Sequence, residues 1–319
     1  MTSKISFFLL SVLLAILIIL NLCLGLSSFE ETQLILKLRF FKTLTAIFAG
    51  AGLGVCGLVL QTWFRNSLAD PFLLGVNSGA NLFIALGVFG ASLFSIDFSN
   101  FSLIFLGVAG GVLTLVLLLS LNKFFNSSVY LIIFGLLFSY LTNGIISIFT
   151  VYGSEYDLKN YLIFTFGSFE KVLGFDIFIF LFSISILSFF IFRIASYFNY
   201  YYLGEEYASS LGIDLRKFQK YLVLLIGATS GLIGVYCGPI IFVGMMAPHF
   251  VRFLCKESDH KVLIPLTFLA GGFLSLLSDV IASHVFNSSL PINIVIGLIG
   301  TPVVGFVLFR SSLKGVSSA

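Results

Sequence analysis

Residues 101–121 read FSLIFLGVAGGVLTLVLLLSL, a run without one charged side chain. An α-helix needs about 20 mostly apolar residues to cross the hydrocarbon core of a bilayer, and this run is long enough. The whole chain follows the same pattern, because 59% of its 319 residues are hydrophobic and only 10% are charged. A soluble domain usually carries about 25% charged residues. The composition therefore predicts that lipid is the solvent of this chain.

Ten apolar runs have the character of membrane spans. Nine of them are long: 5–26, 46–64, 72–94, 101–121, 129–151, 175–192, 221–237, 262–282 and 292–309. The tenth, 240–253, follows Gly238-Pro239 and contains Pro248, so we expect it to be short or bent. Gly300-Thr301-Pro302 should break the last span in the same way. The sequence thus predicts an all-α polytopic membrane protein, one transmembrane domain over residues 1–319 with about ten helices per subunit.

The loops give the orientation. With ten spans and a cytoplasmic N-terminus, most of the 17 Lys and Arg residues fall on the cytoplasmic side of the cytoplasmic (inner) membrane, as the positive-inside rule requires. The net charge of +3 then reflects topology and gives no sign of a nucleic-acid partner. The longest connections are 27–42 and 152–173 outside and 195–220 inside. They are too short to bind a nucleotide, and the chain has no G-x-x-x-x-G-K-[ST] loop.

Two polar segments interrupt the apolar pattern on the predicted cytoplasmic side. Residues 66–80 place an irregular backbone at the membrane boundary, where it is either an ordinary tight turn or part of a water-filled gate. Residues 203–217 begin with the acidic stretch LGEEYASSLG. Glu205 and Glu206 favour the positive end of a short helix, while Ala208 and Leu211 fall on one small apolar face that a partner's groove can hold. The alternative is an amphipathic segment lying on the membrane surface.

Arg39 and Lys42 form a basic pair at the predicted outer mouth of the second span. They are three residues apart and so share one helical face. One interpretation is anchoring in the lipid interface, with the charges reaching water. The other is a basic patch that binds an acidic partner outside the membrane.

Taken in order, these elements resemble the permease subunits of the ABC importers for iron siderophores, haem and cobalamin. The likeness covers nearly the whole chain. The matching stretches are Arg39 to Lys42, Gln61 with Arg65 to Gly75, Leu203 to Gly212, Gly238 to Arg252, and Asp259-His260-Lys261. One departure is Ser67, which stands where the family usually has proline.

The resemblance implies a type II ABC importer permease that is not itself an enzyme, holds no metal or cofactor and carries no catalytic residue. A second copy of the chain completes the channel, a dimer of ABC ATPase subunits binds ATP and Mg²⁺ beneath it, and a periplasmic or lipoprotein substrate-binding protein docks above. The transported substrate is expected to be an iron chelate, such as a ferric siderophore, or haem. The residues implied are Gly204, Glu205, Glu206, Ala208, Leu211 and Gly212 for ATPase coupling, Asn66, Leu68, Ser127 and Ser128 for a cytoplasmic gate, and Arg39 and Lys42 for docking of the binding protein.

Three alternatives remain. Cobalamin members of the family carry a further arginine and an acid where this chain has Ser283-His284 and Ser289, which argues against cobalamin as substrate. Asp279, a carboxylate inside an apolar span, could relay protons in an ion-coupled secondary transporter, or could join helices by accepting hydrogen bonds from a neighbouring span. An aspartyl intramembrane protease needs two such carboxylates, and Asp279 is the only one deep in a span.

Overall fold

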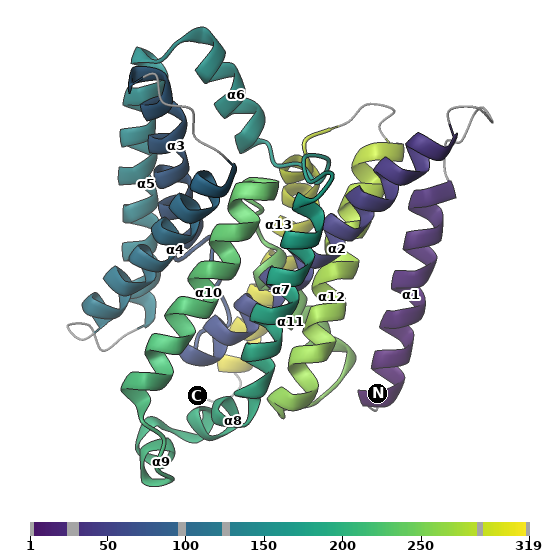
Figure 1. Cartoon of the computed structure of the whole chain (residues 1–319). Helices are drawn as coiled ribbons and strands as arrows, with labels where there is room; N and C mark the ends of the chain where they lie inside the picture. The colour runs from purple at the N-terminus through teal and green to yellow at the C-terminus, as the bar shows by residue number, and fades with distance from the viewer. Residues whose placement is uncertain (1–2, 24–31, 95–99, 123–127, 286–289, 317–319) are drawn as a thin grey trace.

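The computed structural model describes residues 3–23, 32–94, 100–122, 128–285 and 290–316, and its regular elements are all helices (Figure 1). They are α1 (Ser3–Cys23), α2 (Thr32–Trp63), α3 (Val76–Phe94), α4 (Asn100–Asn122), α5 (Ser128–Tyr152), α6 (Glu155–Thr165), α7 (Asp176–Arg193), α8 (Ala195–Leu203), α9 (Glu205–Ser210), α10 (Leu215–Cys237), α11 (Val243–Leu254), α12 (His260–Val280) with the π-helical turn η1 (Ile281–Val285), and α13 (Ile292–Val316).

Each predicted span is a helix. Seven helices of the described chain are long and apolar enough to cross a membrane, α3 and α13 contain shorter apolar helices, and α11 is the short tenth. The three other helices, α6, α8 and α9, lie in the connections. Helices α8 and α9 lie at one end of the bundle together with the N-terminus, the α9 end. Helix α6 and the start of α2 lie at the other, the α6 end (Figure 1).

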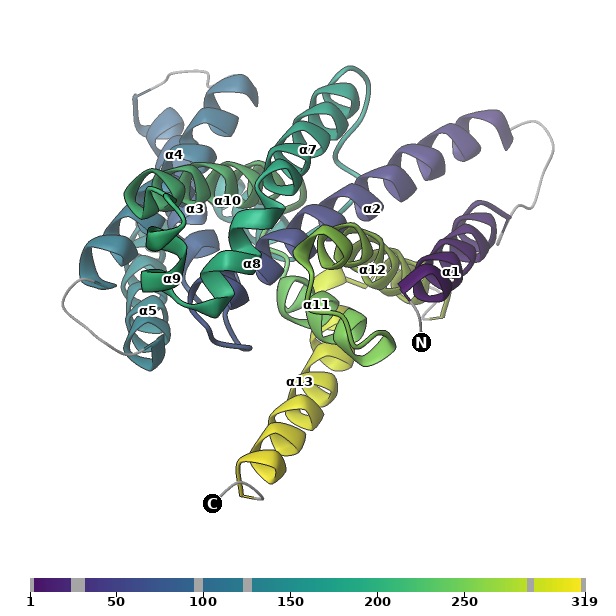
Figure 2. The same cartoon turned by 90° about the horizontal axis from the view of Figure 1, so that it is seen from below.

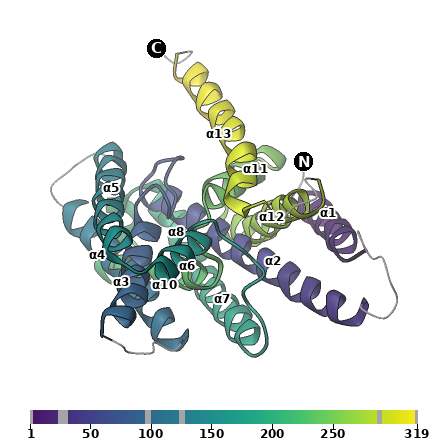
Figure 3. The ribbon, with the colours of Figure 1, turned by 90° about the horizontal axis from the view of Figure 1, so that it is seen from above.

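Two expected boundaries are wrong. Helix α2 begins at Thr32, so most of the expected connection 27–42 is helical, because Lys37, Arg39 and Lys42 lower the hydropathy of this stretch without lowering its helix propensity. Helix α13 continues through Pro302, where we expected a break. Proline removes one hydrogen bond, and transmembrane helices tolerate that loss when neighbouring groups or local adjustments satisfy the freed carbonyl. In Figures 2 and 3 the C-terminal half of α13 projects away from the bundle.

The expected break between α10 and α11 is present at residues 238–242. Phe242 has a left-handed backbone with φ +59°, and Gly238 has φ +77°. The freed carbonyls of this segment are satisfied from other helices: Asn77 of α3 donates its Nδ2 to Ile240 O at 3.4 Å, and Asn293 of α13 donates to Pro239 O. The irregular backbone is thus sealed inside the protein, as the surrounding lipid demands.

Helix α2 crosses the whole bundle and packs against α7, α8, α10, α11 and α12 (Figure 2). Glycines allow the closest approaches. A Cβ at Gly50 would overlap the Gly271 carbonyl oxygen of α12, and a Cβ at Gly57 would overlap the Gly244 carbonyl oxygen of α11. Helices α4 and α10 meet in the same way at Gly107 and Gly231. Small residues drive helix association in membranes because they let backbones come close.

We expect Gly57→Ala to destabilise the protein, because the new methyl group meets a backbone oxygen that cannot rotate away. The loss should be about 1–3 kcal/mol, seen as a lower midpoint of thermal unfolding in detergent. Gly90→Ala in α3 is the matched control. Within the described residues its Cβ would meet nothing within 4 Å, and alanine is the better helix former by about 1 kcal/mol. Equal midpoints for the two variants would contradict this account of the α2–α11 contact.

Candidate functional site

The α9 end carries the segment for which we expected ATPase coupling. Helix α9 lies between two glycines, Gly204 with φ +142° and Gly212 with φ +83°. A Cβ at Gly204 would come no closer than 3.9 Å to another atom, and one at Gly212 would meet nothing described within 4 Å. Glycine is therefore needed at both positions because of the left-handed backbone, and not because a larger side chain would collide with its neighbours. The two glycines make a sharp turn before and after a six-residue helix that begins at Glu205.

The exposed side of α9 differs in one respect from the expectation. Glu206, Tyr207 and Leu211 are exposed, Leu211 by 51%, but Ala208 is fully buried against the chain itself. Ala208 and Leu211 therefore do not share one exposed face, and that prediction is wrong. Beside α9 lies an open hollow of about 720 Å³. Five of its eleven lining residues are aromatic, and the full set is Ile194, Tyr197, Tyr200, Tyr207, Leu211, Gly212, Ile213, Asp214, Lys217, Phe218 and Tyr221.

Residues 64–75, the α2–α3 turn, hold two of the expected gate residues. Asn66 accepts the Leu68 N–H on its Oδ1 at 2.9 Å, and both residues are half-buried. His249 of α11 donates from Nε2 to Ser67 O at 2.8 Å, and Arg65 donates to Tyr201 O of α8 at 3.2 Å. Neighbouring helices thus fix this turn at several points.

The two other expected gate residues are Ser127 and Ser128. Ser127 lies outside the described residues, and Ser128 is the first residue of α5.

The same turn buries a carboxyl group. Asp70 is almost fully buried and lies against Gly244, the second residue of α11. Burial raises the pKa of Asp70 to about 7, and the Phe72 N–H that it accepts offsets only part of this shift. At the start of α12 the opposite holds. The Asn199 side chain donates to Asp259 at 2.7 Å and lowers the pKa of that carboxyl.

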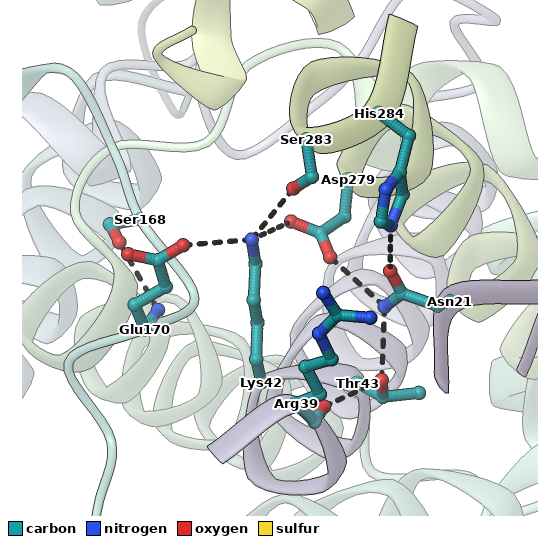
Figure 4. A network of polar contacts seen from close by, with 9 residues as sticks. All are labelled: Asn21, Arg39, Lys42, Thr43, Ser168, Glu170, Asp279, Ser283 and His284. Atoms are coloured by element: carbon teal, nitrogen blue, oxygen red, sulfur yellow. Dashed lines mark hydrogen bonds and ion pairs between the residues drawn. The ribbon is translucent and has the colours of Figure 1, made fainter. Parts of the chain in front are cut away.

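The α6 end holds a second polar cluster, which we call the lysine network (Figure 4). Lys42 of α2 lies 3.1 Å from Oδ1 of Asp279 on α12 and 2.8 Å from Oε1 of Glu170 in the α6–α7 connection. Its Nζ also donates to Ser283 Oγ of η1 at 2.8 Å. Exposure falls from 59% for the Glu170 side chain to 15% for Lys42 and 0% for Asp279. One cation therefore joins an exposed acid to a buried one.

Asn21 of α1 completes the lysine network. Its Nδ2 donates to Asp279 Oδ2 at 3.2 Å and to Thr43 Oγ1 at 3.0 Å. Its Oδ1 faces Nε2 of His284 at 3.3 Å, so that nitrogen carries the proton. Asp279 thus accepts a hydrogen bond from a neighbouring span, which confirms the helix-joining interpretation of this residue. The network links α1, α2, α12, η1 and the α6–α7 connection, and gives Asp279 a structural task that needs no proton transfer.

The two residues of the expected basic pair, Arg39 and Lys42, have different surroundings. Lys42 is mostly buried and engaged by two carboxylates, whereas Arg39 is only half-buried. Sequence reasoning missed Asn21 and Glu170. A signal for Asn21 existed, because a polar residue inside the apolar run 5–26 needs a polar partner in another span, and Asp279 was such a residue.

Comparison with known proteins agrees with this architecture. A family model described as the FecCD transport family matches residues 1–310. The vitamin B12 import system permease BtuC of Photorhabdus laumondii is 32% identical, over 88% of this chain and 84% of its own length. The molybdate import system permease MolB of Haemophilus influenzae is 32% identical, over 90% of this chain and 84% of its own length.

A solved structure shows the same fold. It is described as an inward-facing conformation of an ABC transporter assigned to the metal-chelate type. It superposes on this chain with a TM-score of 0.84 at 29% identity, and covers 97% of this chain and 100% of its own. The expected fold, that of a type II ABC importer permease, is therefore confirmed.

Breaking the buried Lys42–Asp279 ion pair should reduce stability far more than removing the exposed contact between Lys42 and Glu170. We expect Lys42→Met to lower the free energy of unfolding by about 3–5 kcal/mol, because Asp279 is left buried without its cation. Combining Lys42→Met with Asp279→Leu should recover most of that loss. Glu170→Gln, the control on the exposed arm, should change stability by less than about 1 kcal/mol. Thermal unfolding in detergent measures all four proteins. A double variant less stable than Lys42→Met would contradict the assignment.

Proposed function

Because the chain belongs to the FecCD transport family and is a permease subunit of an ABC importer, we propose that it carries an iron chelate, a ferric siderophore or haem, across the cytoplasmic membrane. The observation that supports this substrate class is the near-complete superposition on the transporter of metal-chelate type. Cobalamin is the second candidate, because a relative at 32% identity is named for vitamin B12 import.

The lysine network favours the iron chelate over cobalamin. Cobalamin members of the family, as noted above, have an arginine near Ser283-His284. In this chain Ser283 accepts from Lys42 and His284 pairs with Asn21. These two positions therefore serve the network and add no arginine to the surface on which a binding protein would dock. Arg39 and Lys42 remain the proposed docking pair, with Arg39 the more accessible of the two.

The α9 end is the proposed site of a separate ATPase dimer that binds ATP and Mg²⁺. The exposed Tyr207 and Leu211, the acidic Glu206 and the adjacent aromatic hollow form a surface that suits a protein partner. This end would face the cytoplasm, and the N-terminus lies at the same end (Figure 1).

A second copy of the chain would complete the channel. Helix α5 is the least buried of the long apolar helices, with only 17% of its span buried, yet Asn143 is exposed near its middle. An exposed amide at that depth needs water or protein beside it and not lipid. A path between two copies, closed on the α9 side by Asn66 and Leu68, meets that need.

Uptake by proteoliposomes that contain this permease with its cognate ATPase and binding protein tests the substrate. We expect ATP-dependent accumulation of a ferric siderophore or of haem, and none of cobalamin or molybdate. Accumulation of cobalamin instead would establish the second candidate. Uptake driven by an ion gradient without ATP would contradict the importer mechanism altogether.

Leu211→Arg tests the ATPase contact. A buried charge in the middle of an apolar contact carries an uncompensated desolvation cost, so we expect binding of the ATPase to weaken at least about tenfold, or about 1.4 kcal/mol. Co-purification and titration in detergent measure this affinity. Lys159→Glu, an exposed substitution on α6 at the opposite end, is the control and should bind normally. Normal ATPase binding by Leu211→Arg would remove α9 from the interface.

A further inference from the structure

Three side chains form an internal chain of hydrogen bonds between α8 and the last turn of α2. Oδ1 of Asn199 on α8 lies 2.8 Å from Nδ1 of His260, the first residue of α12. The other ring nitrogen of His260, Nε2, lies 2.8 Å from Oγ1 of Thr62 on α2. His260 and Thr62 are both buried. Asn199 and Thr62 have no role in the proposed function.

The donor and the acceptor of each of these hydrogen bonds follow from the other contacts of Asn199. Asn199 donates its Nδ2 to Asp259 at 2.7 Å, so its Oδ1 is the atom that faces His260. That oxygen accepts the His260 backbone N–H at 2.9 Å and therefore requires a hydrogen on Nδ1 as well. A neutral imidazole that is protonated on Nδ1 presents Nε2 as an acceptor. Thr62 must then donate to His260, and the hydrogen bonds all run in one direction, from Thr62 to Asp259.

Thr62 has a second acceptor for its only hydrogen. The carbonyl oxygen of Leu58, one turn earlier in α2, lies 2.9 Å from Thr62 Oγ1. The hydroxyl can donate to His260 or to Leu58, but not to both at once. The link to His260 can therefore open with Thr62 still satisfied, and only the Nε2 acceptor loses its partner. This gives the contact two discrete arrangements, which a coupling element needs.

The two ends of this hydrogen-bond chain lie beside the two expected functional segments. On the α2 side, the Arg65 N–H donates to Thr62 O at 3.3 Å, so the α2–α3 turn with Asn66 and Leu68 begins at this residue. On the α8 side, Asn199 lies one turn before Gly204 and α9. Phe198 packs α8 against α12 and α10. Its ring centroid lies 5.6 Å from that of His260 and 5.3 Å from that of Phe218.

We propose that Asn199, His260 and Thr62 are positioning residues, a relay that makes the α2–α3 turn follow the movement of α8 and α9 during transport. The inference rests on the proposed function, because it requires an ATPase to move α9. A shift of α8 against α12 would break hydrogen bonds in a buried site, where no water replaces a lost partner and an unsatisfied polar group is costly. The turn therefore moves with α8, or Thr62 switches to Leu58 and only the Arg65 contact with Tyr201 O still joins the two segments.

The test compares Thr62→Val, which keeps the shape and removes the hydroxyl, with Thr62→Ser, which keeps the hydroxyl. Thr267→Val is the matched control, because Thr267 on α12 is equally buried and its hydroxyl has no hydrogen-bond partner among the described residues. Each variant is assembled with its ATPase and binding protein in proteoliposomes. The readouts are ATPase affinity, substrate transported per ATP hydrolysed, and the ATP-dependent change in maleimide labelling of Leu68→Cys in a background without other cysteines.

We expect Thr62→Val to bind the ATPase normally and to hydrolyse ATP, but to transport at least about fivefold less substrate per ATP, a loss of about 1 kcal/mol of coupling. Its labelling at position 68 should no longer respond to ATP. Thr62→Ser and Thr267→Val should behave as the unmodified protein. Asn199→Leu, which breaks the relay at its other end, should reproduce the uncoupling if Thr62→Val fails to fold.

The outcomes separate the two proposals. If the unmodified complex transports with ATP but Thr62→Val and Asn199→Leu keep its transport-to-hydrolysis ratio, the relay is wrong and the importer function stands. If the unmodified chain neither binds an ATPase nor transports with ATP, the proposed function is wrong and the relay falls with it.

Discussion

Lipid offers no hydrogen bonds, and this constraint shapes most of the polar structure of the protein. Asn21 and Asp279 lie in separate apolar helices, and the hydrogen bond between them satisfies polar groups that lipid could not. The carbonyls freed between α10 and α11 are taken up by Asn77 and Asn293. The same demand, applied at the two ends of the bundle, produces the lysine network and the relay.

These two clusters hold helices together by different means. The lysine network uses full charges, of which Asp279 is completely buried, and separating them would strand a charge in a region without water. The relay uses neutral groups, and one of them has a second acceptor within 2.9 Å. The α6 end is thus built to stay assembled, whereas the α9 end is built so that a hydrogen bond can be exchanged. This difference fits the proposal that an ATPase moves the protein from its α9 end.

Much of the fold could be predicted from apolar runs, because ten spans of known length leave few other architectures. The start of α2 could not, since Lys37, Arg39 and Lys42 resemble a loop by hydropathy while remaining good helix formers. Ala208 was misplaced because a six-residue helix has no periodicity that tells which side meets the rest of the chain. Asn21 and Asp279 are 258 residues apart, and local patterns mark each as a polar residue in an apolar run without showing that the two are partners.

Helix α2 connects Lys42 near one end to Thr62 at the other as a single unbroken element of 32 residues, about 48 Å long at 1.5 Å per residue. Its closest contact with α12, at Gly50 and Gly271, lies near its middle, where the two backbones touch. A rigid rod held at its centre behaves as a lever, so its two tips travel in opposite directions. A tilt of about 5° would displace each tip by about 2 Å given that length. A displacement of α2 at one end of the bundle would therefore be accompanied by a displacement in the opposite direction at the other end.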